Sequence, residues 1–263
     1  MERERESGKG AGARGTRPTH PSLPPPPPPP PLYLSPPGGP AKGRPGSFGK
    51  PFRRVTDSLL IANVLFYLAQ VGSRQALTVW GAKINAAIAA GEVWRLLTPA
   101  LLHGNALHLA TNNYALASLG PIVERISGHA RFGSIYTVSA IAGTAASYVF
   151  TKAPSVGASG AIFGVGGALA VFFYRHRSYF GSTSDAVLKA LGQSLAINTA
   201  MGFAIANVDN WGHAGGLAGG ALAAALLGPV LVVDRSGKGG SGSVRDEPPL
   251  KWFAAAPISL SAK

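Results

Sequence analysis

A serine and a histidine lie in two apolar stretches that are far apart in the sequence. Ser159 belongs to a Gly-Ala-Ser-Gly sequence, and His213 ends an Asn-Trp-Gly-His sequence. These residue types can catalyse acyl transfer, because an imidazole that accepts the serine proton activates the hydroxyl and can then protonate a leaving amine. The neighbouring glycines would let a substrate strand approach closely. The pair therefore predicts nucleophilic acyl transfer.

Further groups could stabilise the oxyanion that such a reaction forms. The backbone amides of Ser159 and Gly160 lie near the start of an expected helix, where N–H groups have no partner within the helix. His108 and Asn112 are four residues apart, so they share one face of a helix and could supply more donors. Together these groups predict an oxyanion site.

A carboxylate that would complete a catalytic triad is harder to assign. Asp209 is the only acidic residue near His213. It could orient the imidazole, but its position four residues before the histidine fits equally well a cap at the start of a helix. The sequence leaves both interpretations open.

Small residues in these stretches also have an ordinary structural explanation. A Gly-Ala-Ser-Gly sequence in a membrane helix is usually a packing patch. Gly212, Gly216 and Gly220 repeat every four residues, which indicates close contact with a second helix. A close approach of the two helices would bring His213 towards Ser159, so the packing and the catalytic interpretations are compatible.

Six apolar stretches would have to position these residues. The 263-residue chain is 46% apolar and only 13% charged, about half the charge of a usual soluble domain. The stretches cover residues 55–72, 104–123, 132–151, 156–174, 187–206 and 210–233. Each is about long enough to cross the roughly 30 Å core of a bilayer as a helix. The sequence therefore predicts an all-α polytopic membrane protein with six transmembrane helices.

The distribution of Lys and Arg predicts how these stretches are oriented. Basic residues are more numerous on the side of the membrane where both termini would lie, which predicts that this side is the cytosol or its organellar equivalent. The second, fourth and sixth stretches then all begin on the opposite side, so their polar residues converge there. Residues 74–102 are too interrupted by polar residues to span the membrane, and they predict an interfacial loop.

Polar segments flank the predicted membrane domain of residues 51–233. Residues 1–50 form a basic arm with eight consecutive prolines, which favour polyproline II. This arm is either disordered or an organelle transit sequence. Acidic residues at its very start argue against a transit sequence, whereas their absence from the rest of the arm argues for one. Residues 234–263 are predicted to form a polar C-terminal tail.

Several other classes of protein are excluded. The chain has no cysteine, so it has no disulfide, cysteine-ligated zinc site or cysteine nucleophile. It has no His-Glu-x-x-His sequence and lacks the paired aspartates of an aspartyl intramembrane protease. We expect no cofactor and no metal. The net charge of +13 does not predict nucleic-acid binding, because many of the basic residues lie in the arm beside the membrane spans.

Taken together, these residues resemble the rhomboid family of intramembrane serine proteases. The resemblance covers about residues 51–230. In chain order, the matching motifs are Trp94-Arg95, His103 followed by His108 and Asn112, Gly157-Ala158-Ser159-Gly160, and His213 with Gly216 and Gly220. The resemblance implies a six-helix bundle in which Ser159 is the nucleophile and His213 the general base.

The resemblance also implies roles for the other residues. His108 and Asn112 would be oxyanion donors, and His103 would hold the long first loop in place. Phe163 stands where bacterial relatives commonly place a tyrosine against the catalytic histidine. A phenyl ring can still stack on imidazole but offers no hydroxyl. This difference affects the expected efficiency more than the mechanism.

Two longer strings, residues 80–85 and 152–156, resemble the plant plastid branch of rhomboid-like proteins. This likeness implies a plastid envelope location and makes residues 1–50 part of a transit sequence.

Two functions from different classes follow. In the first, a Ser159–His213 dyad cleaves peptide bonds in or near the transmembrane segments of other proteins in the lipid bilayer. In the second, the same fold is a non-proteolytic scaffold that binds transmembrane segments. A small channel or proton-coupled transporter is disfavoured, because the stretches lack the buried carboxylates that such a protein would carry.

Overall fold

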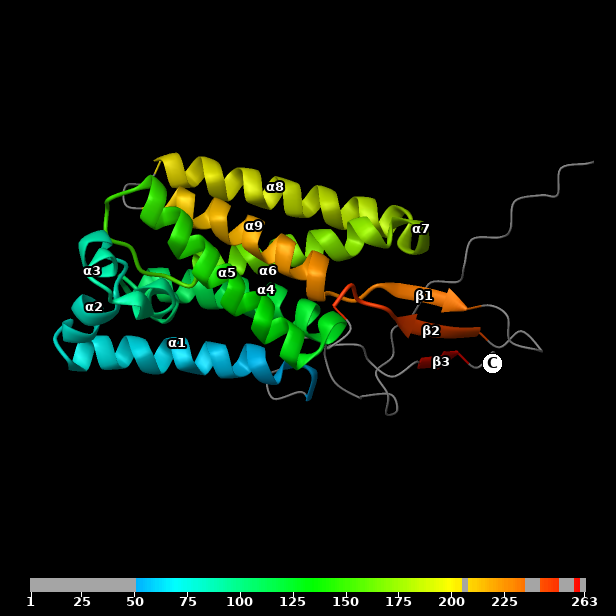
Figure 1. Cartoon of the computed structure of the whole chain (residues 1–263), viewed down its shortest axis with the longest axis horizontal. Helices are drawn as coiled ribbons and strands as arrows, with labels where there is room; N and C mark the ends of the chain where they lie inside the picture. The colour runs from blue at the N-terminus through cyan, green and yellow to red at the C-terminus, as the bar shows by residue number, and fades with distance from the viewer. Residues whose placement is uncertain (1–50, 205–207, 235–241, 251–257, 261–263) are drawn as a thin grey trace, which may run out of the picture. The chain divides into compact units, whose positions relative to one another are not determined.

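The computed structural model describes residues 51–204, 208–234, 242–250 and 258–260. The predicted arm of residues 1–50 lies outside these residues. Within them the chain is mainly helical, and a small antiparallel sheet follows the last helix (Figure 1).

Six helices of 17 to 23 residues make up most of the described chain. These are α1 (Arg54–Gly72), α4 (Ala106–Ser127), α5 (His129–Phe150), α6 (Ser159–Arg175), α8 (Ser182–Ala204) and α9 (Asn210–Leu227). Each overlaps one of the predicted apolar stretches. Among the described residues, α1 is long and apolar enough to cross a membrane by length and composition, and α6 is apolar but shorter.

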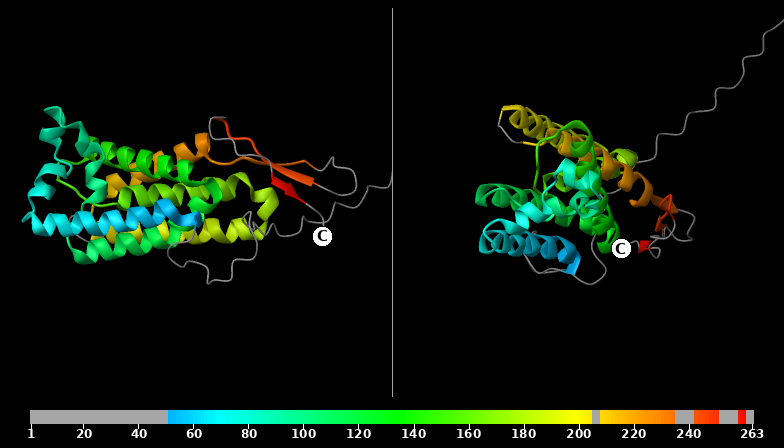
Figure 2. Two further views of the ribbon diagram at one scale, coloured as in Figure 1. Left: turned by 90° about the horizontal axis from the view of Figure 1, so that it is seen from below. Right: turned by 60° about the vertical axis from the view of Figure 1, so that its left-hand side comes forward.

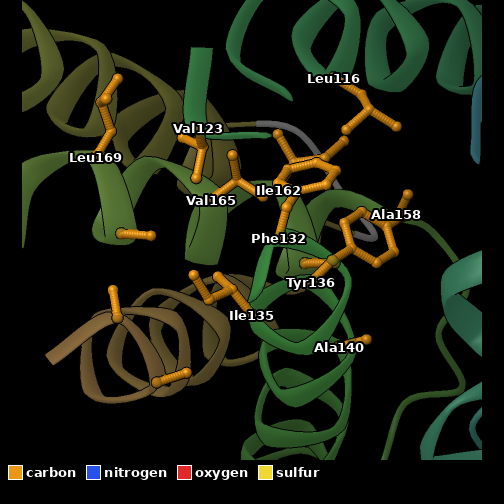
Figure 3. Packing of buried hydrophobic residues seen from close by; sticks show 14 of the residues in the cluster. Leu116, Val123, Phe132, Ile135, Tyr136, Ala140, Ala158, Ile162, Val165 and Leu169 are labelled. Atoms are coloured by element: carbon orange, nitrogen blue, oxygen red, sulfur yellow. The ribbon is translucent and has the colours of Figure 1, made fainter. Parts of the chain in front are cut away.

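The core lies between α4, α5 and α6. Leu116 of α4, Phe132 and Ile135 of α5, and Val165 of α6 have no exposed surface and pack against one another (Figure 3). Figure 2 shows the long helices running alongside each other. Helix α9 packs against α5 and α6, so the starts of α6 and α9, which carry Ser159 and His213, lie together.

Two rows of small residues let α9 pack closely against both α5 and α6. A Cβ added at Gly216 or Gly220 would collide with the backbone of Gly160 or Gly164 in α6. The predicted contact between the fourth and sixth stretches is therefore confirmed. Because neither helix has side chains at these points, their backbones can lie closer than in ordinary helix packing.

The segment between α1 and α4, predicted to be an interfacial loop, contains four short helical elements: α2 (Ala76–Gly81), α3 (Asn85–Ala89), η2 (Val93–Leu96) and η3 (Thr98–Leu101). Two more short elements lie outside it, η1 (Pro51–Arg53) before α1 and α7 (Arg177–Phe180) after α6. Lys83 is fully buried and donates to the carbonyls of Thr151 and Ala153, while Asn85 donates to those of Tyr148 and Thr151. These bonds satisfy carbonyls at the C-terminal end of α5 and fix the segment there.

Helix α1 is attached to α4 by buried polar contacts. Glu124 of α4 accepts hydrogen bonds from the backbone N–H groups of Val55 and Thr56, both at 2.8 Å. A carboxylate at the start of a helix satisfies donors that have no partner within the helix. Further along, Asn63 of α1 donates to Asn113 of α4 at 2.8 Å, so an asparagine pair also links the two helices.

The sixth predicted stretch ends too late. Helix α9 stops at Leu227, and Gly228 and Pro229 follow in place of another turn. Proline lacks the N–H that would continue the helix, and three of the four apolar residues after it are β-branched valines. They form strand β1 (Leu231–Asp234), which pairs with β2 (Gly242–Asp246), and β2 pairs with β3 (Ile258–Leu260). The boundary expected after Val233 therefore falls inside a strand.

A histidine and an ion pair attach this sheet to the helices. Arg131 of α5 pairs with Asp246 of β2. The Nδ1 atom of His176 lies 2.8 Å from the carbonyl of Phe172, and its Nε2 atom lies 2.9 Å from the N–H of Leu231. Since a carbonyl can only accept and an N–H can only donate, His176 is neutral with its proton on Nδ1.

We expect the attachment of β1 at Leu231 to weaken as the pH falls below about 6.5, the usual pKa of histidine. Burial lowers the pKa of His176, and Arg175 adds to this, whereas the Phe172 carbonyl and Asp246 oppose it. The folded protein therefore binds fewer protons at this site than the unfolded chain, and stability is lost as the pH falls towards the lowered pKa. The protection factor of the Leu231 amide in hydrogen exchange measures this.

The variant His176→Gln is the matched control, because an amide can donate and accept but does not titrate. Its Leu231 protection factor should vary much less with pH. If the Leu231 protection factor depends on pH equally in the variant and the wild type, protonation of His176 is not what weakens the attachment of β1.

Candidate functional site

Ser159 and His213 meet where α6 and α9 begin. The Oγ atom of Ser159 lies 2.8 Å from Nε2 of His213, and both side chains are partly buried. Ser159 is the first residue of α6, and His213 lies in the first turn of α9. The structure thus brings together two residues that the sequence separates widely, at a distance suited to proton transfer.

An aromatic ring covers the histidine on one side. Phe163, one turn after Ser159 on α6, stacks on the imidazole with ring centroids 4.2 Å apart and an angle of 9° between the planes. This contact restricts rotation of the His213 side chain. The phenyl ring of Phe163, which has no hydroxyl, therefore still stacks on the imidazole, as expected from the sequence.

Asp209 is a helix cap and has no direct bond to the imidazole. One carboxylate oxygen accepts from the N–H of Gly212 at 2.8 Å, and the other accepts from the hydroxyl of Ser147. The Nδ1 atom of His213 is buried and makes no hydrogen bond within the described part of the chain. Of the two interpretations left open by the sequence, the capping one is confirmed.

His108 borders the same space as Ser159. Gly157 has φ +137°, a conformation that favours glycine, and an added Cβ would lie 2.8 Å from Nε2 of His108 and 3.7 Å from Oγ of Ser159. The N–H of Gly104 points at Nδ1 of His108 at 3.4 Å. If Nδ1 accepts this bond, Nε2 carries the proton and is a donor beside the serine.

The first turn of α6 offers further donors. Its N-cap residue is Ala158, and no side chain in the described part of the chain caps it. The N–H groups of Ser159 and Gly160 belong to the turn that has no partners within the helix. Asn112, by contrast, is buried and donates to the carbonyl of His108 in its own helix at 3.0 Å. Its role as an oxyanion donor stays a prediction.

His103 lies behind His108 at the start of the same region. Its ring is buried and meets that of His108 edge-on at 5.4 Å. Its backbone N–H and carbonyl both bond the side chain of Gln70 in α1, at 3.0 and 3.1 Å. The residue thus lies between the first long helix and the candidate site.

Trp94 and Arg95 lie in the short elements before α4. Arg95 is buried and donates to the carbonyls of Val79 and Ala82, while Trp94 stacks on Trp80 at 5.9 Å. These contacts join η2 to α2, so both residues hold this segment together and neither bonds the Ser159–His213 pair.

Residues on α5 complete the site and were missed by the sequence analysis. Gly143 faces the start of α9, where an added Cβ would lie 2.7 Å from the carbonyl oxygen of Gly212, and Ser147 bonds Asp209. Ser139, Gly143 and Ser147 are all buried and spaced four residues apart. This stripe of small residues on one helix face, two of them serines, was the signal that could have identified them.

The comparisons with known proteins agree on one family. The family model for the rhomboid domain matches residues 90–230. The chain is 45% identical over 189 residues to the rhomboid protease GluP of Bacillus subtilis, covering 68% of this chain and 36% of GluP.

Two Arabidopsis thaliana relatives carry organelle names. RHOMBOID-like protein 9, chloroplastic, is 34% identical over 166 residues, covering 62% of this chain and 37% of that protein. RHOMBOID-like protein 6, mitochondrial, is 38% identical over 127 residues, covering 48% of this chain and 41% of that protein. The chain thus spans well under two thirds of the length of each of these relatives. The matched domain includes both Ser159 and His213, and the chain belongs to the rhomboid family.

Proposed function

We propose that this protein is an intramembrane serine protease with a Ser159–His213 dyad, built on six membrane-spanning helices. The observation that carries the proposal is the 2.8 Å contact between Oγ of Ser159 and Nε2 of His213 at the starts of two packed helices. The rhomboid protease name of GluP, a relative with 45% identity, supports the same reaction class.

The residues around the dyad fit the steps of acyl transfer. His213 would accept the proton of Ser159 as its Oγ attacks the scissile carbonyl, and would then donate it to the leaving amine. The first-turn N–H groups of α6 and Nε2 of His108 would stabilise the oxyanion, with Asn112 as a further donor. Water would then cleave the acyl-enzyme with His213 again as base, which releases the second product and restores Ser159.

The proposed substrates are transmembrane segments of other proteins in the bilayer. A peptide bond in a regular helix is shielded from attack, so such a segment must unwind locally before Ser159 can reach it. Small or helix-breaking residues at the cut would lower the cost of unwinding. The proposed location is the plastid envelope, which the chloroplastic Arabidopsis relative supports and the mitochondrial one does not.

The test is to purify the protein in detergent and treat it with a fluorophosphonate probe and with a tagged single-span substrate. An activated Ser159 should take the label and the substrate should be cleaved, whereas Ser159→Ala should do neither. Substrate binding without labelling or cleavage by the wild type would overturn the proposal in favour of the non-proteolytic scaffold.

A further inference from the structure

A polar cluster borders the dyad. It contains Asp209 at the start of α9, Ser147 near the end of α5, and Ser155 in the connection to α6. The hydroxyls of Ser147 and Ser155 are 3.5 Å apart, and Ser147 donates to Asp209. A cavity of about 30 Å³ is lined by residues that include Ser155, Asp209, Ser159 and His213. The cluster and the dyad therefore share one small space.

The Asp209 carboxylate is held from two directions. The N–H of Gly212 bonds one oxygen, and Ser147 bonds the other. An added Cβ at Gly212 would lie only 3.0 Å from the carboxylate, so the side chain packs tightly over the first turn of α9. A group fixed in this way can fix the backbone from which His213 extends.

A buried cation on the first loop complements this carboxylate. Lys83 is fully buried, and its ammonium donates to the carbonyls of Thr151 and Ala153. Burial lowers the pKa of Lys83, and the negative charge of Asp209 opposes that effect. The two groups thus interact electrostatically across the connection between α5 and α6.

On the side away from Ser159, His213 has no hydrogen-bond partner among the residues that the structure describes. Its Nδ1 atom is buried and makes no hydrogen bond to the described residues. A buried polar atom of this kind is costly, and a polar cavity of this size holds one water molecule. Asp209, Ser155 and His213 all line this cavity, so they are the candidate partners of such a water.

From this geometry we infer that Asp209 is a positioning residue for His213, acting through the capped first turn of α9 and through one water in the shared cavity. This inference rests on the proposed function. A bridge from the carboxylate to Nδ1 keeps the proton on that nitrogen, which leaves Nε2 able to accept the proton of Ser159. The dyad would then work as a triad whose third member acts through water.

The variant Asp209→Asn separates this role from capping. Asparagine caps a helix about as well as aspartate, so the unfolding temperature should stay near that of the wild type. Loss of the carboxylate should lower kcat by about 10- to 100-fold, less than for a direct carboxylate–histidine bond. KM should change little, because Asp209 would not touch the substrate. The fluorophosphonate labelling rate of Ser159 should fall in parallel.

Two further variants complete the experiment. Asp185→Asn removes an exposed acid on α8 and should leave kcat, KM and labelling unchanged. Ser147→Ala removes one support of the carboxylate and should lower kcat in the same direction by a smaller factor. A wild-type kcat in Asp209→Asn would overturn the inference. So would a lower kcat in Asp209→Asn that is accompanied by a lower unfolding temperature, if Ser147→Ala stays fully active. Failure of the wild type itself to cleave and to label would instead overturn the proposed function.

Discussion

Ser159→Ala and His213→Ala should each lower kcat by about 10³-fold or more, and the double variant should be no slower than the slower single variant. The reason is that the two side chains act as one unit, joined by the 2.8 Å contact between Oγ and Nε2. Without the imidazole the hydroxyl keeps its proton, and without the hydroxyl the imidazole has no nucleophile to activate. Single-turnover cleavage of a single-span substrate in proteoliposomes measures this.

Ser118→Ala is a matched control for the serine variant. Ser118 is exposed on α4 and donates only to the carbonyl of Tyr114 in its own helix, so its loss should leave kcat unchanged. Additive losses in the double variant would mean that Ser159 and His213 contribute independently. That result would contradict a dyad even if both single variants were slow.

The meeting of Ser159 and His213 could be predicted because it depends on few choices. Because the sequence predicts that the fourth and sixth stretches are helices that begin on the same side, it also predicts that both residues lie near one end of the bundle. The spacing of Gly212, Gly216 and Gly220 then indicated which helix face would make the close contact. Helix periodicity and residue size were sufficient for this part of the site.

Other features depended on partners that are distant in the sequence. The apolar run after Pro229 is compatible with a helix or a strand, and pairing with residues 242–246 decides for the strand. In the sequence, Asp209 fits equally well the role of a helix cap and that of a partner of His213. The packing of α5, which places Ser147 beside its carboxylate, is not visible in the sequence. Lys83 resembles an ordinary loop lysine in the sequence, and only the folded chain places it against the carbonyls at the end of α5.

Gly216→Ala should destabilise the protein by about 3 kcal/mol or more and lower kcat by about 10²-fold. The added Cβ would meet the carbonyl oxygen of Gly160 and lie 2.6 and 2.9 Å from its C and Cα atoms. These are backbone atoms of a packed helix, which cannot rotate away as a side chain could. Helix α9 must therefore shift relative to α6, and His213 moves with it, away from Ser159. Thermal unfolding in detergent and the cleavage rate measure the two effects.

Gly166→Ala tests whether this loss comes from the helix contact. Gly166 lies on α6, the partner of α9 in this contact, but an added Cβ there would have no atom within 4 Å. Its replacement should be neutral or stabilise by about 0.5–1 kcal/mol, because alanine favours the helix more than glycine does. Since the same gain applies at Gly216, any net loss there must come from the collision with α6. Equal stability of the two variants would show that α9 can move away from α6 without loss of folding free energy. The close glycine contact would then not be what holds His213 at Ser159.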